Sequence, residues 1–238
     1  MLLQILLLPL VAMLQETLGQ MNNGLVANIS ESQQKEIIDN HNNIRRSVYP
    51  TASNMMKMEW NAKASEHAKK SVGKCRGTVS PKEELLVDGI MCNQIVLQSK
   101  RANFWIDVIH MWNDTGVNFK YGISAIDPKH DISVYTQLVW HNSYQIGCAY
   151  AFCPKNEFNY FFLCNYCPAG NILSQLLRPY KAGPPCENCP DSCEENLCIS
   201  SCKYMDTMKG CDIMVRQFQG CSSNVVKRNC KATCNCRR

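Results

Sequence analysis

Sixteen cysteines dominate the residues of this 238-residue chain that could do chemistry. The runs CENC (186–189) and CPDSC (189–193) have a spacing that suits a tetrahedral zinc site, provided that the sulfurs are thiolates. The alternative is that the cysteines pair as disulfides. Residues 186–238 contain no histidine, and an oxidising compartment would favour disulfides over zinc, so we expect bridges here.

The N-terminus indicates which compartment that is. The run MLLQILLLPLVAML is apolar but short for a transmembrane helix, and it leads into the small-residue stretch 17–19. We predict a signal peptide over residues 1–19, no transmembrane segment in the rest of the chain, and a secreted, extracellular protein. An even number of cysteines in such a protein predicts about eight disulfides.

The five histidines are the other candidates for catalysis or metal binding. His41 lies on the apolar face of a predicted helix, where a histidine is more often part of the core than a ligand. His110 and His141 neighbour bulky aromatic residues, which indicates packing or a rim position, and His67 and His130 complete the set. No Ser-His-Asp or Cys-His motif is present, so we expect no catalytic residue, no metal and no cofactor.

The first 180 residues contain predicted helices followed by predicted strands. Ser30 and Gln33 form a possible capping box before a helical pattern that runs to residue 48, and a second helix is predicted over 61–72. A third follows in NFWIDVIHMW, with Asn103 as its N-cap. Three stretches alternate like strands: SVYTQLVW (133–140), IGCAYAF (146–152) and FNYFFLCNY (158–166). This order predicts an α+β fold in which helices cover a sheet.

The distribution of cysteine and charge predicts a second, smaller unit. Six cysteines lie between 75 and 167, whereas ten crowd into 186–236, a segment too short and polar to bury a core without bridges. The helix-breaking run RPYKAGPPC (178–186) separates the two. Residues 202–238 carry a net charge of +6, whereas the whole chain carries +5. The small unit therefore carries all of the chain's excess positive charge. Such a unit is attracted to acidic surfaces, although the same charges also serve solubility.

Several long segments resemble the cysteine-rich secretory proteins (CRISPs) of the CAP superfamily. They are IDNHNNIRRSVYPTASNMMKMEW (38–60), YTQLVWHNSYQIGCAYAFCP (135–154), FFLCNYCPAGN (161–171) and the cysteine spacing of 186–236. PTASNMMKMEW and PYKAGPPC are similar to reptile-venom members in particular, and mammalian reproductive-tract members share much of the same sequence.

The resemblance implies an α-β-α sandwich CAP domain over residues 20–180. A disulfide hinge over 181–201 and a cysteine-rich domain similar to anemone potassium-channel toxins over 202–238 would follow it. It also implies the disulfide pairing, which spacing alone leaves open. The implied pairs are Cys75–Cys153, Cys92–Cys167, Cys148–Cys164, Cys186–Cys193, Cys189–Cys198, Cys202–Cys236, Cys211–Cys230 and Cys221–Cys234.

CAP domains typically have a cleft with two histidines and two acidic residues that can hold a divalent metal. At the matching positions this chain has residues that neither bind a metal nor move a proton: Val79, Gln94, Thr115 and Val134. The resemblance therefore implies a cleft without its chemistry. Two glycosylation sequons begin at Asn28 and Asn113, and the second spans the position of Thr115.

The resemblance implies a non-enzymatic modulator of calcium, potassium, cyclic-nucleotide-gated or ryanodine-type channels. Anemone toxins carry a lysine and an aromatic residue in the loop that here reads SSNVVKRN, which has no aromatic, so capping of a channel vestibule is favoured over pore plugging. We expect no nucleic-acid partner. Two alternatives remain: a sperm-surface adhesion protein acting through a cell-surface receptor, and a sterol or lipid carrier. The residues expected to face the channel are Lys227, Arg228, Lys231, Arg237, Arg238, Tyr204 and Phe218.

Overall fold

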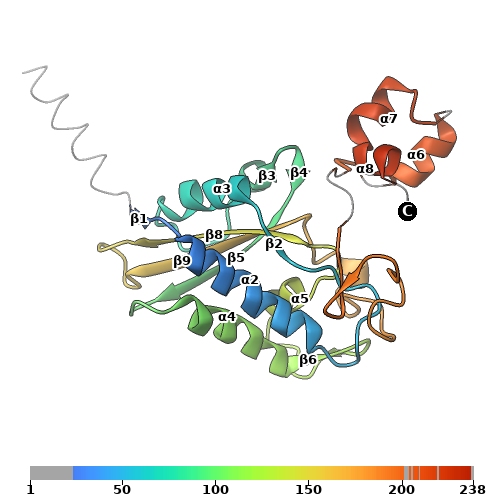
Figure 1. Cartoon of the computed structure of the whole chain (residues 1–238). Coiled ribbons are helices and arrows are strands. Elements are labelled where there is room, and N and C mark those ends of the chain that lie inside the picture. Colours follow the sequence, from blue (N-terminus) through green and yellow to red (C-terminus); the bar gives the residue numbers. More distant parts are fainter. Residues whose placement is uncertain (1–23, 201–203, 205, 209, 219, 237–238) are drawn as a thin grey trace, which may run out of the picture.

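The fold is built around one five-stranded sheet, seen in the computed structural model of Figure 1. The structure describes residues 24–200, 204, 206–208, 210–218 and 220–236; the predicted signal peptide lies outside them. The order of the main strands is β1, β8, β9, β5, all antiparallel, and β2 adds to β8 in parallel. Their bounds are β1 Leu25–Ala27, β2 Glu59–Trp60, β5 Asn93–Ser99, β8 Gln145–Phe152 and β9 Tyr160–Cys167.

Helices cover both faces of this sheet (Figure 1). One face carries α3 (Ala62–Val72), and the other carries α2 (Glu31–Arg46), α4 (Trp105–Asp114) and α5 (Ser133–Leu138). Successive residues of β9 point to opposite faces. Phe161 and Leu163 pack on the α3 side, whereas Phe162 and Tyr166 join the larger core beneath α2 and α4. The predicted α-β-α sandwich is confirmed.

Local sequence explains where the main helices begin. The predicted capping box is present: the Ser30 hydroxyl accepts from the backbone N–H of Gln33, whose side chain accepts from the Ser30 N–H. Asn61 caps α3 in the same way through the N–H of Ala64. Gly147 is needed where α3 meets β8, because a Cβ there would lie 2.1 Å from the backbone nitrogen of Ser65.

Two predictions of local structure were wrong. Residues 133–140 do not form a strand; Ser133–Leu138 is the short helix α5, which buries Thr136 and Leu138. The carboxylate of Asp131 accepts from both the N–H and the hydroxyl of Ser133, which favours a turn there, and burial then outweighs β-propensity. Asn103 does not cap α4 either, because its amide donates to the Ser99 hydroxyl and Phe104 takes the N-cap position.

Small elements connect these layers. Two hairpins project from the sandwich, β3 (Leu86–Val87) with β4 (Ile90–Met91) and β6 (Phe119–Lys120) with β7 (Ser124–Ala125). Short 3-10 helices span η1 Lys82–Leu85, η2 Thr115–Asn118 and η3 Leu173–Gln175. After residue 186 follow the hairpin of β10 (Cys193–Glu194) and β11 (Leu197–Cys198), and then α6 (Cys211–Gln217), α7 (Asn224–Asn229) and α8 (Lys231–Asn235).

Seven disulfides join pairs of cysteines that both lie within the described residues, and each has the pairing that the resemblance implies. The eighth expected pair involves Cys202, which lies outside the described residues. Three bridges belong to the sandwich, two to the hairpin after it and two to the helical module. They are Cys75–Cys153, Cys92–Cys167, Cys148–Cys164, Cys186–Cys193, Cys189–Cys198, Cys211–Cys230 and Cys221–Cys234.

Candidate functional site

The resemblance assigns Val79, Gln94, Thr115 and Val134 to the CAP cleft. In the structure, two of these side chains are hydrogen-bonded to neighbouring residues and the other two are apolar. The Gln94 amide accepts from the N–H of Ser80 and donates to Asn165, both at 2.8 Å. The Thr115 hydroxyl donates to the carbonyl of Trp112, and Val134 packs against the main core. Val79 is half exposed. None of these four groups can ligate a metal strongly or transfer a proton at neutral pH.

The histidines are spread over different parts of the fold. His41 is fully buried, which confirms that it is a core residue. Burial, together with a smaller effect of the Arg45 charge, lowers the pKa of His41 and of His141 to about 4. His110 is exposed, and His130 lies 3.0 Å from the Asp127 carboxylate at the surface.

The cysteine cluster that suggested zinc is a disulfide cluster. Cys186, Cys189 and Cys198 have sulfurs close enough to share an ion, and within the described part of the chain they are the one such group of His, Cys, Asp and Glu side chains. However, Cys189 is bonded to Cys198 and Cys186 to Cys193. A disulfide sulfur is no thiolate and is a poor zinc ligand, so these residues do not fit the metal.

The candidate site with the most distinctive chemistry is the C-terminal module, defined here as residues 204–236 as far as the structure describes them. Its core is very small: Cys211, Val226 and Cys230 are its buried apolar residues, and two disulfides enclose them. The three helices α6, α7 and α8 pack around this core (Figure 1). A core of this size leaves most side chains of the module in contact with solvent.

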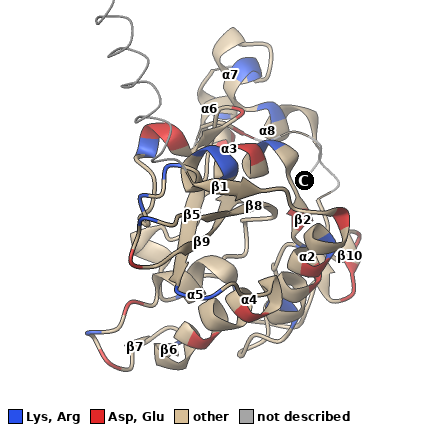
Figure 2. Cartoon of the chain, turned by 90° about the vertical axis from the view of Figure 1, so that its left-hand side faces the viewer, with Lys and Arg blue, Asp and Glu red and all other residues tan. Residues whose placement is uncertain are grey.

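The module presents cations whose charges are not neutralised nearby. Lys227 and Arg228 lie exposed in the last turn of α7, and Lys231 is exposed at the start of α8. Figure 2 colours the Lys and Arg positions of these helices blue. Within the described residues none of the three has an ion-pair partner. The two acids of the module are otherwise engaged: Asp206 accepts from the N–H and hydroxyl of Thr233, and Asp212 lies 3.8 Å from Arg216.

Exposed apolar side chains lie beside cations of the module, a feature that the sequence analysis missed in part. Residues three apart share a helix face, so Val225 adjoins Arg228 on α7, and Ile213 adjoins Arg216 on α6. Val225 is 50% exposed and Ile213 54% exposed. The sequence shows that a β-branched residue precedes an arginine by three positions in each helix. It does not show which face of α7 is exposed, and the burial of Val226 identifies that face.

The other predicted contact residues are partly accounted for. Phe218 is 49% exposed directly after α6, and Tyr204 is 37% exposed. Arg237 and Arg238 lie outside the described residues. We therefore define the module surface as the exposed cations and apolar residues that the structure places: Tyr204, Met208, Ile213, Arg216, Phe218, Val225, Lys227, Arg228 and Lys231.

The segment before the module is attached to the sandwich. The N–H of Cys198 donates to the carbonyl of Met55 at 2.8 Å, and the N–H of Lys57 donates back to the carbonyl of Cys198 at 2.7 Å. Ion pairs join Lys57 to Glu194 and Arg46 to Glu195. The hairpin β10–β11 therefore packs as an extension of the sandwich and carries the module at its end.

Comparison with known proteins agrees with both parts of this architecture. The model of the cysteine-rich secretory protein family (CAP) matches residues 38–166, and the model named Crisp matches residues 186–238. No helix in the described part of the chain is long and apolar enough to cross a membrane.

Three solved structures share the fold at low sequence identity. Na-ASP-1 is 24% identical with a TM-score of 0.61, and the alignment covers 72% of this chain and 48% of that one, so this chain spans about half its length. Venom allergen-like protein 4 of Schistosoma mansoni is 24% identical, with 65% and 97% covered and a TM-score of 0.54. Hookworm platelet inhibitor is 20% identical, with 75% and 96% covered and a TM-score of 0.54.

Proposed function

Because the chain belongs to the cysteine-rich secretory protein family, we propose that it is a secreted, non-enzymatic protein that modulates an ion channel. In this proposal the module surface docks on the acidic outer mouth of the channel, and the sandwich orients the module and adds contact area. Residues 1–19 act as its signal peptide, and residues 20–180, 181–201 and 202–238 act as CAP domain, hinge and channel-regulatory domain.

The observation that carries the proposal is the unneutralised charge of Lys227, Arg228 and Lys231 beside exposed apolar side chains. Charge complementarity speeds encounter with an acidic partner, and desolvated apolar and aromatic anchors slow dissociation. Phe218 and Val225 supply such anchors. The module also lacks the lysine-aromatic pair of the anemone toxins in its SSNVVKRN loop, so contact with the rim of a pore fits it better than insertion into the pore.

A non-enzymatic role is supported by what occupies the cleft positions. Glutamine, threonine and two valines stand where the family has its histidines and acids, and the Gln94 amide is hydrogen-bonded at both its oxygen and its nitrogen. The sterol-carrier alternative loses its main support, because the aromatic run 158–166 contributes Phe161, Phe162 and Tyr166 to the buried core. The adhesion alternative would use the same fold, and expression in reproductive tissue rather than venom gland would favour it.

The proposal is tested by patch-clamp recording with the fully oxidised protein. Voltage-gated calcium and potassium currents and cyclic-nucleotide-gated and ryanodine-receptor currents are recorded at two ionic strengths. We expect block of at least one current, weaker at the higher ionic strength because salt screens exposed charges. Absence of block on every current would reject channel modulation.

A pair of charge-matched variants sharpens the test. Lys227→Gln with Arg228→Gln removes two charges from the module surface, whereas Lys120→Gln with Lys129→Gln removes two exposed charges from the sandwich. We expect the first double variant to weaken block by about tenfold or more and the second to leave it unchanged. Equal block by both would contradict the electrostatic docking of the module.

A further inference from the structure

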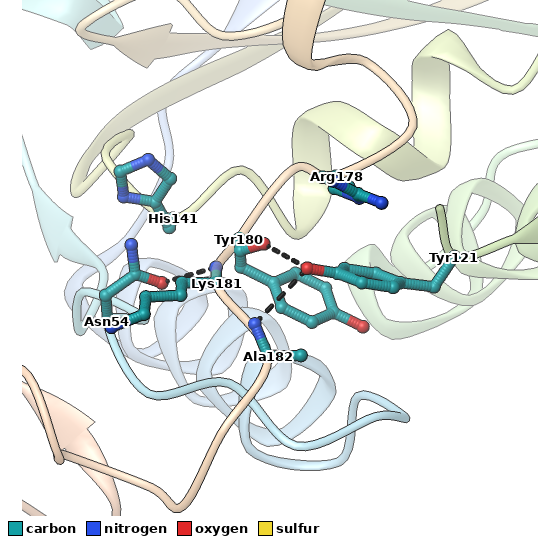
Figure 3. Close-up of a pocket in the computed structure, with 7 residues that line it drawn as sticks. All are labelled: Asn54, Tyr121, His141, Arg178, Tyr180, Lys181 and Ala182. Atoms are coloured by element: carbon teal, nitrogen blue, oxygen red, sulfur yellow. Dashed lines mark hydrogen bonds between the residues drawn. The ribbon is translucent and has the colours of Figure 1, made fainter. Parts of the chain in front are cut away.

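A second site lies on the sandwich, where the segment 178–182 crosses the loop at residue 141. An open pocket with a volume of about 510 Å³ lies there. Figure 3 draws the side chains that line it. It is lined by Asn54, Tyr121, His141, Arg178, Tyr180, Lys181 and Ala182. This volume is within the range of sites that bind small molecules, about 300–1,000 Å³.

Hydrogen bonds hold the walls of this pocket in place. The Tyr121 hydroxyl donates to the carbonyl of Tyr180 at 2.7 Å and accepts from the N–H of Ala182 at 3.2 Å (Figure 3). The side-chain oxygen of Asn54 accepts from the N–H of Lys181 at 2.8 Å. The N–H of His141 donates to the carbonyl of Pro179. Two remote parts of the chain are thereby joined around one depression.

The charge in and beneath the pocket is positive. Arg178 and Lys181 are exposed at its edge, and the lining contains no Asp or Glu. Beneath it lies Arg45, which is 1% exposed and donates to the carbonyls of Met56, Leu138 and His141. In the part of the chain that the structure covers, Arg45 has no carboxylate partner. None of these three cations forms an ion pair within the described residues, which favours an anion at this place.

Uncommitted hydrogen-bond donors surround the same space. The Asn54 amide nitrogen and the ring nitrogens of His141 make no hydrogen bond to any described residue, and neither does the Arg178 guanidinium. The Lys181 ammonium makes one, to Asn188 at 3.3 Å, which leaves two of its three N–H groups. In Figure 3 the Asn54 amide points toward His141 on one side of the pocket, and Arg178 lies on the other. We call these four side chains the donor cluster: Asn54, His141, Arg178 and Lys181.

We propose that the donor cluster binds a doubly charged oxyanion, a phosphate or sulfate group. A tetrahedral oxyanion offers acceptor oxygens in several directions, as donors on opposite sides of a pocket require, whereas a carboxylate offers two oxygens in one plane. The volume exceeds that of the bare ion, so the pocket also accommodates a small molecule that carries the group, with the Tyr121 ring as one wall. The site lies on the sandwich and is independent of the proposed action of the C-terminal module.

The test is an NMR titration of the isotopically labelled, fully oxidised full-length protein. Inorganic phosphate and inorganic sulfate are added at neutral pH and constant ionic strength, with sodium chloride and sodium acetate as comparison salts. We expect saturable shifts of the Asn54 side-chain amide and the His141 ring with phosphate or sulfate, at least tenfold tighter than with acetate. Glucose 6-phosphate and glucose 6-sulfate distinguish the source: tighter binding than the bare ion identifies an ester, and equal binding identifies the free ion.

Variants separate this site from non-specific attraction to a basic protein. Arg178→Gln with Lys181→Gln is expected to weaken binding about tenfold or more, since hydrogen bonds to charged groups are the strong ones. Lys129→Gln removes an exposed charge outside the pocket lining and should leave binding unchanged. The proposal is overturned if acetate or chloride produces the same shifts, if the double variant binds as tightly as the unmodified chain, or if the shifts occur at Lys227 and Arg228 instead.

Discussion

The hydroxyl of Tyr166 donates a hydrogen bond to Nε2 of His41, with 2.8 Å between the two atoms. The other ring nitrogen, Nδ1, lies 2.7 Å from the carbonyl oxygen of Ile37, which can only accept, so Nδ1 carries the proton. The imidazole is therefore neutral and both its nitrogens are satisfied. Because the ring is completely buried, a second proton would place a charge in the core at the cost of the Tyr166 bond.

This relationship predicts loss of stability in acid. Burial lowers the pKa of His41 from 6.5 to about 4, so between these values the unfolded chain binds a proton that the folded chain does not. The free energy of unfolding should be highest above pH 6.5 and should fall by about 3 kcal/mol for His41 as the pH drops toward 4. Guanidinium unfolding with intact disulfides across this range measures the loss.

Matched substitutions identify the residue responsible. His41→Gln should unfold more easily at neutral pH and show a smaller decrease in stability on acidification. His110→Gln changes an exposed histidine and should keep the full decrease. A decrease of the same size in the His41 variant would assign the acid sensitivity to other groups.

Arg45 and Arg46 are adjacent arginines with opposite environments, and their substitution should differ accordingly. Arg45→Met leaves three buried carbonyl groups without their donor, each worth about 1–3 kcal/mol, so a loss of several kcal/mol is expected. Arg46→Met removes a partly exposed ion pair with Glu195, which contributes at most about 1 kcal/mol. Denaturant unfolding of the two variants checks this. A similar loss for both would mean that Arg45 does not hold the loop at residues 138–141.

The C-terminal module should depend on one bridge for its fold. Cys211–Cys230 closes a sequence separation of 19 residues and supplies two of the three buried residues of the module. Replacing both cysteines by alanine should cost about 2–5 kcal/mol and unfold α6–α8, while the sandwich stays intact. NMR spectra that still show a folded module would refute this. Cys186→Ala with Cys193→Ala, which opens a separation of only 7, is the control and should leave the module folded.

Both sequons should carry glycans if the chain passes through the secretory pathway. Asn28 is exposed just before α2, and Asn113 is partly exposed at the end of α4. Asn113 also lines a second pocket together with Val48, Tyr49 and Tyr135, so a glycan there would obstruct that pocket. Peptide mapping before and after enzymatic deglycosylation of secreted protein gives the occupancy of each site. Unmodified Asn28 and Asn113 peptides would contradict the prediction.

Much of the fold could be predicted because local patterns and tertiary packing agree there. The alternation in residues 146–152 and 158–166 matches the two faces of β8 and β9, and the capping box at Ser30 begins α2 as expected. The error at residues 133–138 has the opposite cause. A short segment rich in β-branched residues was folded into a helix by burial that no local pattern reveals.

The donor cluster could not be predicted from the sequence, for a different reason. Asn54 and Lys181 are more than a hundred residues apart, and nothing in either segment predicts that they meet. They meet because Ala52 pairs with Ala182 in a β-bridge and the N–H of Ser53 donates to the carbonyl of Lys181. The sequence predicts the run 178–186 as the boundary between the two units, although Tyr180 within it is 2% exposed in the core.

The attachment of Cys198 to the strand-like segment of Met55 and Lys57 decides how mechanical load would pass through the molecule. A pull on the C-terminal module is resisted by the hydrogen bond from the N–H of Ile199 to the carbonyl of Ser192. At Cys198 it is also resisted by two hydrogen bonds to the sandwich and by the bridge to Cys189. These contacts keep the β10–β11 hairpin from being pulled away from the sandwich by a force on its C-terminal end. If the module were bound to a membrane protein, tension would therefore pass directly to the sandwich. The hairpin would not extend under that force.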